Sequence, residues 1–314
     1  MNKFNKVVIL GGTGFIGAQL ATKLSPKSKK IIIPTRNTES NPGLKMIPNL
    51  EIVSTDVKDE RSINLLLEDA DLVINTVGIL NEINEDNSFD KIHYQLPKKV
   101  SNSIKKNEVK RFMHISSLNA DPKSIGKYLK SKGKAEDFLI SETSSFCNLT
   151  IFRPSIVFGE SDSFFNKFAS LLKFLPIFPL ACPNAKFMPV YVEDLTDFMI
   201  STINNIDSYG KKIDVTGPGE YTFRELINHT LAALKIRRLI IPLNSFLSRL
   251  QASVFEKLPG KLFTMDNYQS LQIDSCSDEG FKGSSSLEDI IPQYLNIKTK
   301  QERFEKLRKK SGRK

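Results

Sequence analysis

A glycine-rich turn near the amino terminus constrains the fold of this 314-residue chain more than any other feature. The apolar run Val7–Leu10 leads directly into Gly11, Gly14 and Gly17, in the spacing G-x-x-G-x-x-G, and an amphipathic segment follows. In a strand–turn–helix unit the first glycine makes the tight turn, the second lets the backbone approach a pyrophosphate, and the third lets helix and sheet pack closely. The amino terminus of the helix then offers N–H groups to the phosphates. The sequence therefore predicts a dinucleotide-binding unit.

Short β-branched runs alternate with amphipathic stretches over residues 1–160, which is typical of a parallel α/β sheet. We expect a doubly wound sheet of the Rossmann type, with ligands outside the carboxyl ends of the strands. The expected strands are Val7–Leu10, Lys30–Ile33, Leu50–Ser54, Leu72–Asn75, Arg111–Ile115 and Leu149–Phe152. The expected helices are Phe15–Leu24, Glu60–Glu68, Phe89–Lys106 and Lys127–Glu142.

The pattern loosens after Arg153, and we expect residues 161–297 to form a smaller α/β domain for a substrate or a docking partner. Part of residues 187–204 is expected to return to the first domain as a strand followed by a helix. Helices are expected at Phe164–Leu175 and at Thr222–Leu234, where Thr222 and Glu225 have the spacing of a capping box. The segment Leu175–Leu180 reads as an apolar loop.

Residues 236–261 form a basic and apolar stretch. Its apolar side chains recur near helical spacing at Leu239, Ile240, Leu243, Phe246, Leu247 and Leu250. We predict a helix that faces the core of the smaller domain. The alternative is a helix that lies in a groove or on a membrane surface.

The net charge of +10 is concentrated at the carboxyl terminus. Lys298–Lys314 holds nine Lys or Arg and two Glu, which is +7, and the rest of the chain carries 10 − 7 = +3. This basic tail is either a solvated end or a contact for nucleic acid, anionic lipid or an acidic protein face. Nucleic-acid binding by the main body is not expected, because that part is near neutral and lacks aromatic–basic interleaving.

The composition argues against several other classes of protein. Three widely spaced cysteines without a C-x-x-C indicate neither a disulfide framework nor a zinc site, and they favour a reducing compartment. No apolar stretch approaches the ~20 residues that cross a bilayer, and no signal peptide is recognisable. His93, His114 and His229 are isolated in the sequence, so we expect structural histidines and no metal site.

The end of the second expected strand indicates which dinucleotide is preferred. An acid at this point would hold the ribose hydroxyls of NAD, but here the strand leads into Arg36 and the nearest acid is Glu39. A guanidinium grips a 2′-phosphate, whereas a carboxylate repels it, so Arg36 favours NADP(H) with NAD(H) as the alternative. Asp56, after the third strand, is placed to reach the adenine amine. Thr76–Gly78, after the fourth, would pass close to the ribose.

Tyr128 and Lys132 lie four residues apart on an expected helix, so their side chains share one face. Beside a nicotinamide the lysine would lower the pKa of the tyrosine and bind the ribose. The tyrosine could then exchange a proton with a carbonyl or an alcohol. The chain contains two further Y-x-x-x-K pairs, but only this one directly follows the fifth strand, which ends at Ser116 and Ser117.

The glycine turn, Ser116 and the Tyr128–Lys132 pair together resemble the extended short-chain dehydrogenase/reductase superfamily. Four phrases are similar to an atypical branch that contains the nucleotide-binding accessory subunit of respiratory complex I (NADH:ubiquinone oxidoreductase) and its bacterial relatives. They are FMHISSLNA from Phe112, YLKSK from Tyr128, RPSIVFG from Arg153 and MPVYVED from Met188. The resemblance extends from about Lys6 to Asp274.

This resemblance implies a bound NADPH, and in the complex I subunit the cofactor is thought to be structural, with the protein supporting assembly near the quinone-binding junction. The candidate cofactor-binding residues are Gly11, Thr13, Gly14, Phe15, Ile16, Gly17, Arg36, Asp56, Val57, Thr76, Val77, Gly78, Tyr128, Lys132 and Pro154. The candidate catalytic residues are Tyr128, Lys132 and Ser116.

We therefore expect an accessory or assembly-type subunit that contacts complex I or the membrane surface through its carboxyl-terminal domain and basic tail. The alternative is an NAD(P)-dependent oxidoreductase or a nucleotide-sugar epimerase or dehydratase; a sensor of the NADPH/NADP ratio is a further one. No transit segment precedes the glycine turn, which leads us to expect a bacterial protein of the cytoplasm, at most peripheral to the inner face of the membrane.

Overall fold

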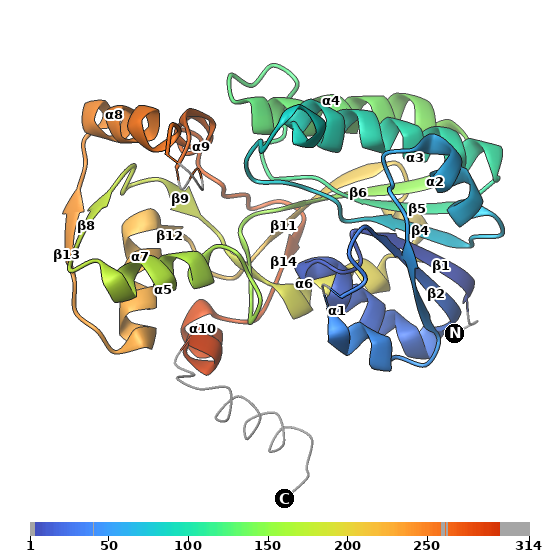
Figure 1. The fold of residues 1–314 in the computed structure, drawn as a ribbon, viewed down its shortest axis with the longest axis horizontal. Coiled ribbons are helices and arrows are strands. Elements are labelled where there is room, and N and C mark those ends of the chain that lie inside the picture. Colours follow the sequence, from blue (N-terminus) through green and yellow to red (C-terminus); the bar gives the residue numbers. More distant parts are fainter. Residues whose placement is uncertain (1–3, 40, 259–260, 262, 296–314) are drawn as a thin grey trace, which may run out of the picture.

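Eight parallel strands form one sheet in the larger lobe of the molecule, with helices on both faces (Figure 1). The structure is a computed structural model that describes residues 4–39, 41–258, 261 and 263–295. The strand order is β14-β11-β6-β5-β4-β1-β2-β3, and every pairing in this sheet is parallel. The strands are β1 (Phe4–Leu10), β2 (Ser28–Thr35), β3 (Leu50–Ser54), β4 (Leu72–Asn75), β5 (Arg111–Ile115), β6 (Asn148–Pro154), β11 (Lys211–Thr216) and β14 (Phe281–Lys282). The predicted doubly wound Rossmann sheet is confirmed.

The direction of strand order reverses between β1 and β4. The chain adds β2 and β3 on one side of β1, and β4, β5 and β6 on the other side. Leu10 at the end of β1 lies opposite Asn75 at the end of β4. In open α/β sheets the crevice outside the carboxyl ends of two such strands is where ligands bind. The glycine turn follows β1 at this point.

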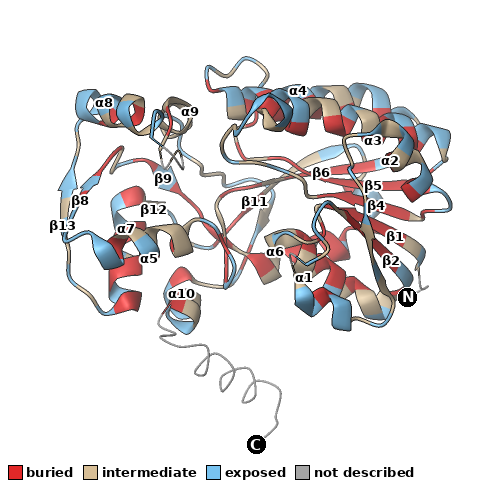
Figure 2. Ribbon diagram, viewed as in Figure 1, coloured by how far each residue is buried: buried red, intermediate tan, exposed pale blue. Residues whose placement is uncertain are grey.

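Helices cover the two faces of the sheet, and the strands between them are buried, as the red ribbons of Figure 2 show. One apolar cluster joins α1 and α6 to one face, and a second cluster joins α2, α3 and α4 to the other. The helices are α1 (Phe15–Leu24), α2 (Glu60–Leu67), α3 (Leu96–Lys106), α4 (Lys127–Glu142) and α6 (Val192–Ser201). Because both faces are covered, the central strands are apolar throughout rather than alternating.

The predicted helix Phe89–Lys106 is divided in two. A π-helical turn spans Asp90–Gln95, and α3 begins at Leu96. Pro97 lies in the first turn of α3 and has no N–H with which to bond the carbonyl of His93, so a regular α-helix cannot pass through this point. Single π-helical turns inside helices are frequent at functional sites.

Two strands of the sheet were not predicted. β11 (Lys211–Thr216) is hydrogen-bonded beside β6, and β14 (Phe281–Lys282) forms the edge. Both are poor in the apolar β-branched runs that mark the central strands, so only the pairing with a distant neighbour reveals them. The expected strand and helix within residues 187–204 are β10 (Val190–Tyr191) and α6, and α6 returns to pack on the sheet beside α1.

A smaller lobe, built mainly from the second half of the chain, packs around a phenylalanine-rich core that includes Phe158, Phe165, Phe187 and Phe223. Its helix α7 begins at the predicted capping box of Thr222. Its helices are α5 (Phe165–Phe174), α7 (Phe223–Leu234), α8 (Ser245–Phe255), α9 (Met265–Ser270) and α10 (Leu287–Leu295). Short strands of this part of the chain are β7 (Val157–Phe158), β8 (Ile177–Leu180), β9 (Lys186–Phe187), β12 (Tyr221–Thr222) and β13 (Leu239–Pro242).

The predicted apolar loop over Leu175–Leu180 is wrong. Ile177–Leu180 is the strand β8, which pairs in parallel with β13 more than sixty residues later in the chain. Proline at position 179 suggested a loop, but it is compatible with an edge strand, where a missing N–H costs no ladder bond. A short strand whose partner is so remote in sequence has no local signal.

The predicted core-facing helix over residues 236–261 is also wrong. The first part is the strand β13 and the second is α8, and most of the expected core residues face outward. Leu239 is 60% exposed, Phe246 75% and Leu250 50%. The apolar spacing was correct for α8, but spacing alone does not say which side of a helix meets the protein.

The basic tail Lys298–Lys314 lies outside the described residues. Among the residues that the structure does describe, we find no helix with both the length and the apolar character needed to cross a membrane.

Candidate cofactor-binding site

Two glycines of the turn after β1 have no room for a side chain. Gly11 has a φ of +77°, a left-handed value that favours glycine, and a Cβ there would lie 2.8 Å from Thr76 Oγ1. A Cβ on Gly17 would lie 2.4 Å from the carbonyl oxygen of Gly11. These two glycines are therefore required for the turn itself and for the close approach of α1.

Gly14 has a different role, because a Cβ there would meet only the Gly11 carbonyl oxygen, at 3.2 Å. Gly14 is the N-cap of α1, and among the described residues no side chain caps this helix and no acid lies in its first turn. The N–H groups of Phe15, Ile16 and Gly17 therefore begin a helix whose positive dipole end is available to an anion. The cradle fits the pyrophosphate of a dinucleotide.

The segment after β4 joins this cradle to the helix α4. Thr76 Oγ1 donates a hydrogen bond to the carbonyl of Leu10 at 3.0 Å, which holds the segment beside the glycine turn. Gly78 follows, and a Cβ there would lie 3.6 Å from Lys132 Nζ and 3.7 Å from His93 Nε2. A ligand that lies along Thr76–Gly78 would therefore reach Lys132 at the other end.

His93 lies in the π-helical turn and is fully buried. Its Nε2 accepts a hydrogen bond from the Ile79 N–H at 3.0 Å, and its Nδ1 lies 3.0 Å from Ser131 Oγ. Because Nε2 is an acceptor, we assign the proton to Nδ1, which donates to Ser131. Burial and the positive charge of Lys132 hold the pKa of His93 well below its ordinary value, so the ring is neutral. Both ring nitrogens of His93 have hydrogen-bond partners, and its place beside Gly78 was not predicted.

The Tyr128 ring packs edge-on against two rings from the turn before α3. Its centroid lies 5.3 Å from that of His93 and 5.7 Å from that of Phe89. Burial raises the pKa of the Tyr128 phenol, a hydrogen bond with Ser117 lowers it, and the negative charge of Asp266 raises it, with a net increase. The phenol is therefore held in its protonated form.

The structure favours Ser117 over the predicted Ser116 as the hydroxyl beside this phenol. Ser116 Oγ is buried and has no hydrogen-bond partner among the described residues. Ser117 Oγ donates to the Leu118 carbonyl at 3.3 Å and also bonds the Tyr128 side chain. Both serines follow β5, and which of them faces α4 depends on how the backbone leaves the strand.

Lys132 is buried one turn after Tyr128, with 4% of its surface exposed. Its Nζ donates a hydrogen bond to the Ile115 carbonyl at 3.1 Å. Burial lowers the pKa of Lys132 to about 8, although the negative charge of Glu136 opposes this effect. An ammonium with this depressed pKa would be stabilised by a ligand that brings hydroxyl oxygens or negative charge.

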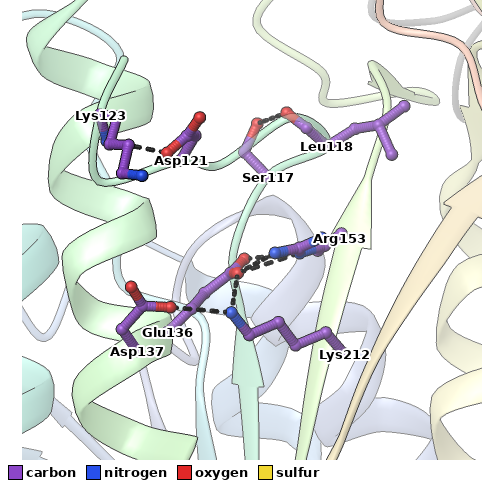
Figure 3. A network of polar contacts seen from close by, with 8 residues as sticks. All are labelled: Ser117, Leu118, Asp121, Lys123, Glu136, Asp137, Arg153 and Lys212. Atoms are coloured by element: carbon purple, nitrogen blue, oxygen red, sulfur yellow. Dashed lines mark hydrogen bonds and ion pairs between the residues drawn. The ribbon is translucent and has the colours of Figure 1, made fainter.

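A buried ionic network anchors the far side of α4 (Figure 3). Arg153 on β6 forms a salt bridge with the fully buried carboxylate of Glu136, and Lys212 on β11 approaches the same carboxylate at 3.2 Å. Lys212 also pairs with Asp137 at 3.0 Å. Removing one partner would leave a buried charge unpaired, so the network holds α4 in one position over β6 and β11.

The amino terminus of α4 is capped from the other lobe. The Asp266 carboxylate, at the start of α9, accepts hydrogen bonds from the backbone N–H groups of Lys127 and Tyr128, the latter at 3.2 Å. Figure 1 shows α9 between α8 and α4. A carboxylate at a helix amino terminus satisfies N–H groups and interacts favourably with the dipole. This contact has no local sequence signal, because 138 residues separate Asp266 from Tyr128.

Arg36 directly follows β2 and is exposed. The nearest acid, Glu39, is paired with Lys45, and this hydrogen bond lowers the pKa of the Glu39 carboxyl. The carboxylate that would oppose a 2′-phosphate is therefore neutralised by its own partner. The end of β2 therefore carries an exposed positive charge.

The remaining predicted residues lie at the carboxyl ends of other strands. Asp56 is exposed after β3, and its Oδ1 accepts a hydrogen bond from the Lys58 N–H. Val57 packs against the apolar cluster on the α2 side of the sheet. The rest are Thr13 in the glycine turn, Val77 after β4 and Pro154 at the end of β6. The doubly wound topology thus brings to one edge of the sheet residues that are spread over about 140 positions of sequence.

Comparison with known proteins indicates an NAD(P)H-binding domain in the first half of the chain. A family model described as NAD(P)H-binding matches residues 11–163, which span the glycine turn, Tyr128 and Lys132. Subunit 9 of the NADH dehydrogenase [ubiquinone] 1 alpha subcomplex from Mus musculus is 28% identical over 298 residues, covering 93% of this chain and 78% of the mouse protein. The Arabidopsis thaliana subunit of the same name is 26% identical, covering 91% of this chain and 74% of its own length.

This chain is similar to those mitochondrial subunits over most of its length. Its resemblance to the complex I accessory branch of the short-chain dehydrogenase/reductase superfamily, expected from four phrases, is confirmed over nearly the whole chain. The protein carries an NAD(P)H-binding domain.

Solved structures agree on the fold. The UDP-N-acetylglucosamine 4-epimerase of Methanobrevibacter ruminantium M1 superposes with a TM-score of 0.68 and 18% identity, covering 94% of this chain and 98% of that one. The dTDP-glucose 4,6-dehydratase of Bacillus anthracis str. Ames, in complex with NAD, superposes with a TM-score of 0.68 and 14% identity, covering 97% and 98%. The fold shared with these enzymes therefore includes the smaller lobe.

Proposed function

We propose that this protein is a complex I-associated accessory subunit that holds NADP(H) as a structural cofactor and does not turn it over. The similarity to mitochondrial NADH dehydrogenase subunits carries the accessory role, and the environment of Tyr128 supports the absence of turnover. Its phenol has a raised pKa, and Asp266 adds negative charge beside it. A tyrosine that transfers protons at neutral pH needs a lowered pKa instead. The free amino terminus of α1 and the buried Lys132 support cofactor binding, whereas the raised pKa of the Tyr128 phenol argues against proton transfer.

The cofactor would be held by the chain as follows. The first-turn N–H groups of α1 bind the pyrophosphate, and Arg36 binds the 2′-phosphate, which makes NADP(H) the preferred form. Lys132 and Tyr128 bind the ribose of the nicotinamide half. NADPH can donate a hydride when bound. We propose that here its binding instead holds together the two sides of the crevice between β1 and β4.

The proposed location is the cytoplasm, at the inner face of the membrane, with the partner complex bound there. Two features support it: the relatives named as subunits of an NADH dehydrogenase, and the +7 charge of the basic tail, which favours acidic surfaces.

The decisive experiment measures what co-purifies with the protein and whether it reacts. We expect about one NADPH per chain, identified by absorbance and mass, that stays reduced when carbonyl substrates are added. We also expect Tyr128→Phe to leave assembly of the respiratory complex nearly unchanged. A bulky residue at Gly14 should lower the amount of assembled complex. Absence of nicotinamide from the purified protein would contradict the proposal.

A second function is favoured by one contact. The hydrogen bond between Ser117 and Tyr128, beside Lys132, is an arrangement that an NAD(P)-dependent oxidoreductase or a nucleotide-sugar epimerase would use. If this function is correct, the wild type reduces or epimerises a carbonyl substrate, and Tyr128→Phe abolishes the reaction while NADPH affinity is retained.

A further inference from the structure

The smaller lobe exposes a group of large apolar side chains on β8, β13 and α8. We call it the α8 face and define it by Ile177, Leu239, Ile241, Phe246, Leu250 and Val254. Phe246 is 75% exposed, Leu239 60% and Val254 50%. Scattered exposed apolar residues are normal on a soluble protein, but a contiguous group marks a site of interaction.

The strand pair and the helix that carry the α8 face lie against each other. In the parallel pair of β8 and β13, Leu239 lies opposite Ile177, and Ile241 lies opposite Pro179. Gln251 on α8 donates a hydrogen bond to the Pro179 carbonyl at 3.1 Å, which ties the helix to this strand pair. Figure 1 shows α8 directly beyond the ends of β8 and β13.

The helix α8 has its apolar side turned away from the protein. Phe246, Leu250 and Val254 follow at intervals of four residues, so they share one side of the helix. The opposite side consists of Ser248 and Ala252, which are fully buried. Small residues against the lobe and large apolar residues outward are the reverse of the usual surface helix, so the outward side needs an external partner.

The charges around this face are nearly all positive. Within residues 173–180 and 235–258 the basic residues are Lys173, Lys235, Arg237, Arg238, Arg249 and Lys257, and the only acid is Glu256. Five of the six basic residues are exposed. A cationic rim around an apolar face matches a surface that is negative outside and apolar beneath.

We propose that the α8 face docks on an anionic phospholipid bilayer, with Phe246, Leu250 and Val254 at the acyl boundary and the basic rim on the phosphates. This inference rests on the proposed peripheral location and names the surface and the lipid class that produce it. A bilayer supplies both required properties in one continuous plane, because anionic headgroups lie directly over apolar chains. The face is separate from the cofactor cradle, so docking and cofactor retention are independently measurable.

The test uses the absence of tryptophan from this chain. In the full-length protein, Phe246→Trp places the only tryptophan of the chain on the α8 face, and its emission is excited selectively at the red edge of the tryptophan band, where tyrosine does not absorb. The matched control is Ile206→Trp, because Ile206 is 77% exposed but lies in the short helix Ile206–Ser208 after α6. Each variant is mixed with vesicles of equal parts phosphatidylglycerol and phosphatidylcholine, and with the same vesicles containing bromine-labelled acyl chains.

We expect a blue shift of emission and quenching by the brominated chains for Phe246→Trp, and neither for Ile206→Trp. Adding Leu250→Ser and Val254→Ser to Phe246→Trp should reduce the quenching several-fold. Adding Arg249→Glu should raise the vesicle concentration needed for the half-maximal blue shift of emission. Vesicles of pure phosphatidylcholine should cause little blue shift and little quenching. The basic tail can hold the protein near the vesicles, but it cannot place this side chain among acyl chains.

Three results would overturn the proposal. Vesicle binding without quenching of Phe246→Trp would assign binding to another surface. Equal quenching in pure phosphatidylcholine would remove the role of the basic rim. A blue shift that depends on protein concentration without vesicles would make a second copy of this chain the occupant. NADPH content is measured on the same samples, so a failure of docking with cofactor retained is distinguishable from a failure of the proposed function.

Discussion

The Asp266 carboxylate of the smaller lobe accepts a hydrogen bond from the backbone N–H of Tyr128 at 3.2 Å. One side chain therefore caps the helix that carries Tyr128 and Lys132, and its charge also raises the pKa of the Tyr128 phenol. The position of the smaller lobe and the state of the candidate site are linked through this contact.

Replacing Asp266 tests the link. Asp266→Ala should lower the free energy of unfolding by about 0.5–2 kcal/mol, the usual effect of losing a helix cap. It should also lower the pKa of Tyr128, because the nearby negative charge is gone. Chemical denaturation measures the first effect, and ultraviolet titration of the phenols in wild type and Asp266→Ala measures the second.

Asp266→Asn is the matched variant. It retains a capping oxygen, so it should keep most of the stability while still lowering the pKa of Tyr128. An unchanged phenol titration in both variants would disprove the electrostatic link.

Arg36 should decide between the two nicotinamide dinucleotides. We expect the wild type to bind NADPH more tightly than NADH, and Arg36→Asp to reverse this order by on the order of 1–3 kcal/mol, because a charge-assisted pair is lost and a repulsive charge is added. Titration calorimetry with both cofactors provides the measurement. Arg61→Asp on α2 makes the same change of charge at an exposed position away from β2, and it should leave the order unchanged. Equal affinities of the wild type for NADPH and NADH would rule out this role.

The glycines of the turn should separate folding from binding. Gly17→Ala should destabilise the fold, since its Cβ would lie 2.4 Å from a backbone oxygen that cannot move easily. Gly14→Val should change stability less but prevent NADPH binding, because its side chain would point where the pyrophosphate is expected. Thermal unfolding without cofactor and NADPH fluorescence measure the two effects. Gly43→Ala is a control, because its Cβ would meet only a side-chain atom at 3.5 Å. Normal NADPH binding by Gly14→Val would show that the cradle lies elsewhere.

The buried ammonium of Lys132 should give the stability a specific dependence on pH. Its pKa falls from the ordinary value of 10.5 to about 8 in the folded state, because burial disfavours the charge. Between pH 8 and 10.5 the unfolded chain binds more protons at this group than the folded chain, so this group makes stability rise with pH there. The full effect is roughly 3 kcal/mol, from the conversion of about 1.4 kcal/mol per pKa unit.

Lys132→Met should remove that rise while keeping the packing of the aliphatic part of the side chain. The free energy of unfolding is measured by denaturation from pH 7 to 11 for both proteins, and the difference between them isolates the group. Lys134→Met, an exposed position on the same helix, serves as the control. If the free energies of unfolding of the wild type and of Lys132→Met change in parallel with pH, the Lys132 ammonium is not desolvated.

The sequence alone determined the parts of this protein whose physics is local. The turn Gly11–Gly17 could be predicted because a left-handed φ and a close backbone approach each require glycine at a single position. The strands β1 and β4 could be predicted because burial on both faces of a sheet requires continuous apolar runs. The place of the ligand crevice followed from topology. The preference for NADP(H), proposed from Arg36, also begins as a local property of the end of β2.

Only the tertiary structure decided the features that depend on distant partners. β8 becomes a strand because β13 pairs with it, Ser117 rather than Ser116 meets Tyr128 because of how the chain leaves β5, and Asp266 caps α4 from the other lobe. The apolar residues of α8 had the right spacing for a helix. Their outward orientation arises because Ser248 and Ala252 are small enough to pack against the lobe. Periodicity defines the sides of a helix, but packing selects the side that is buried.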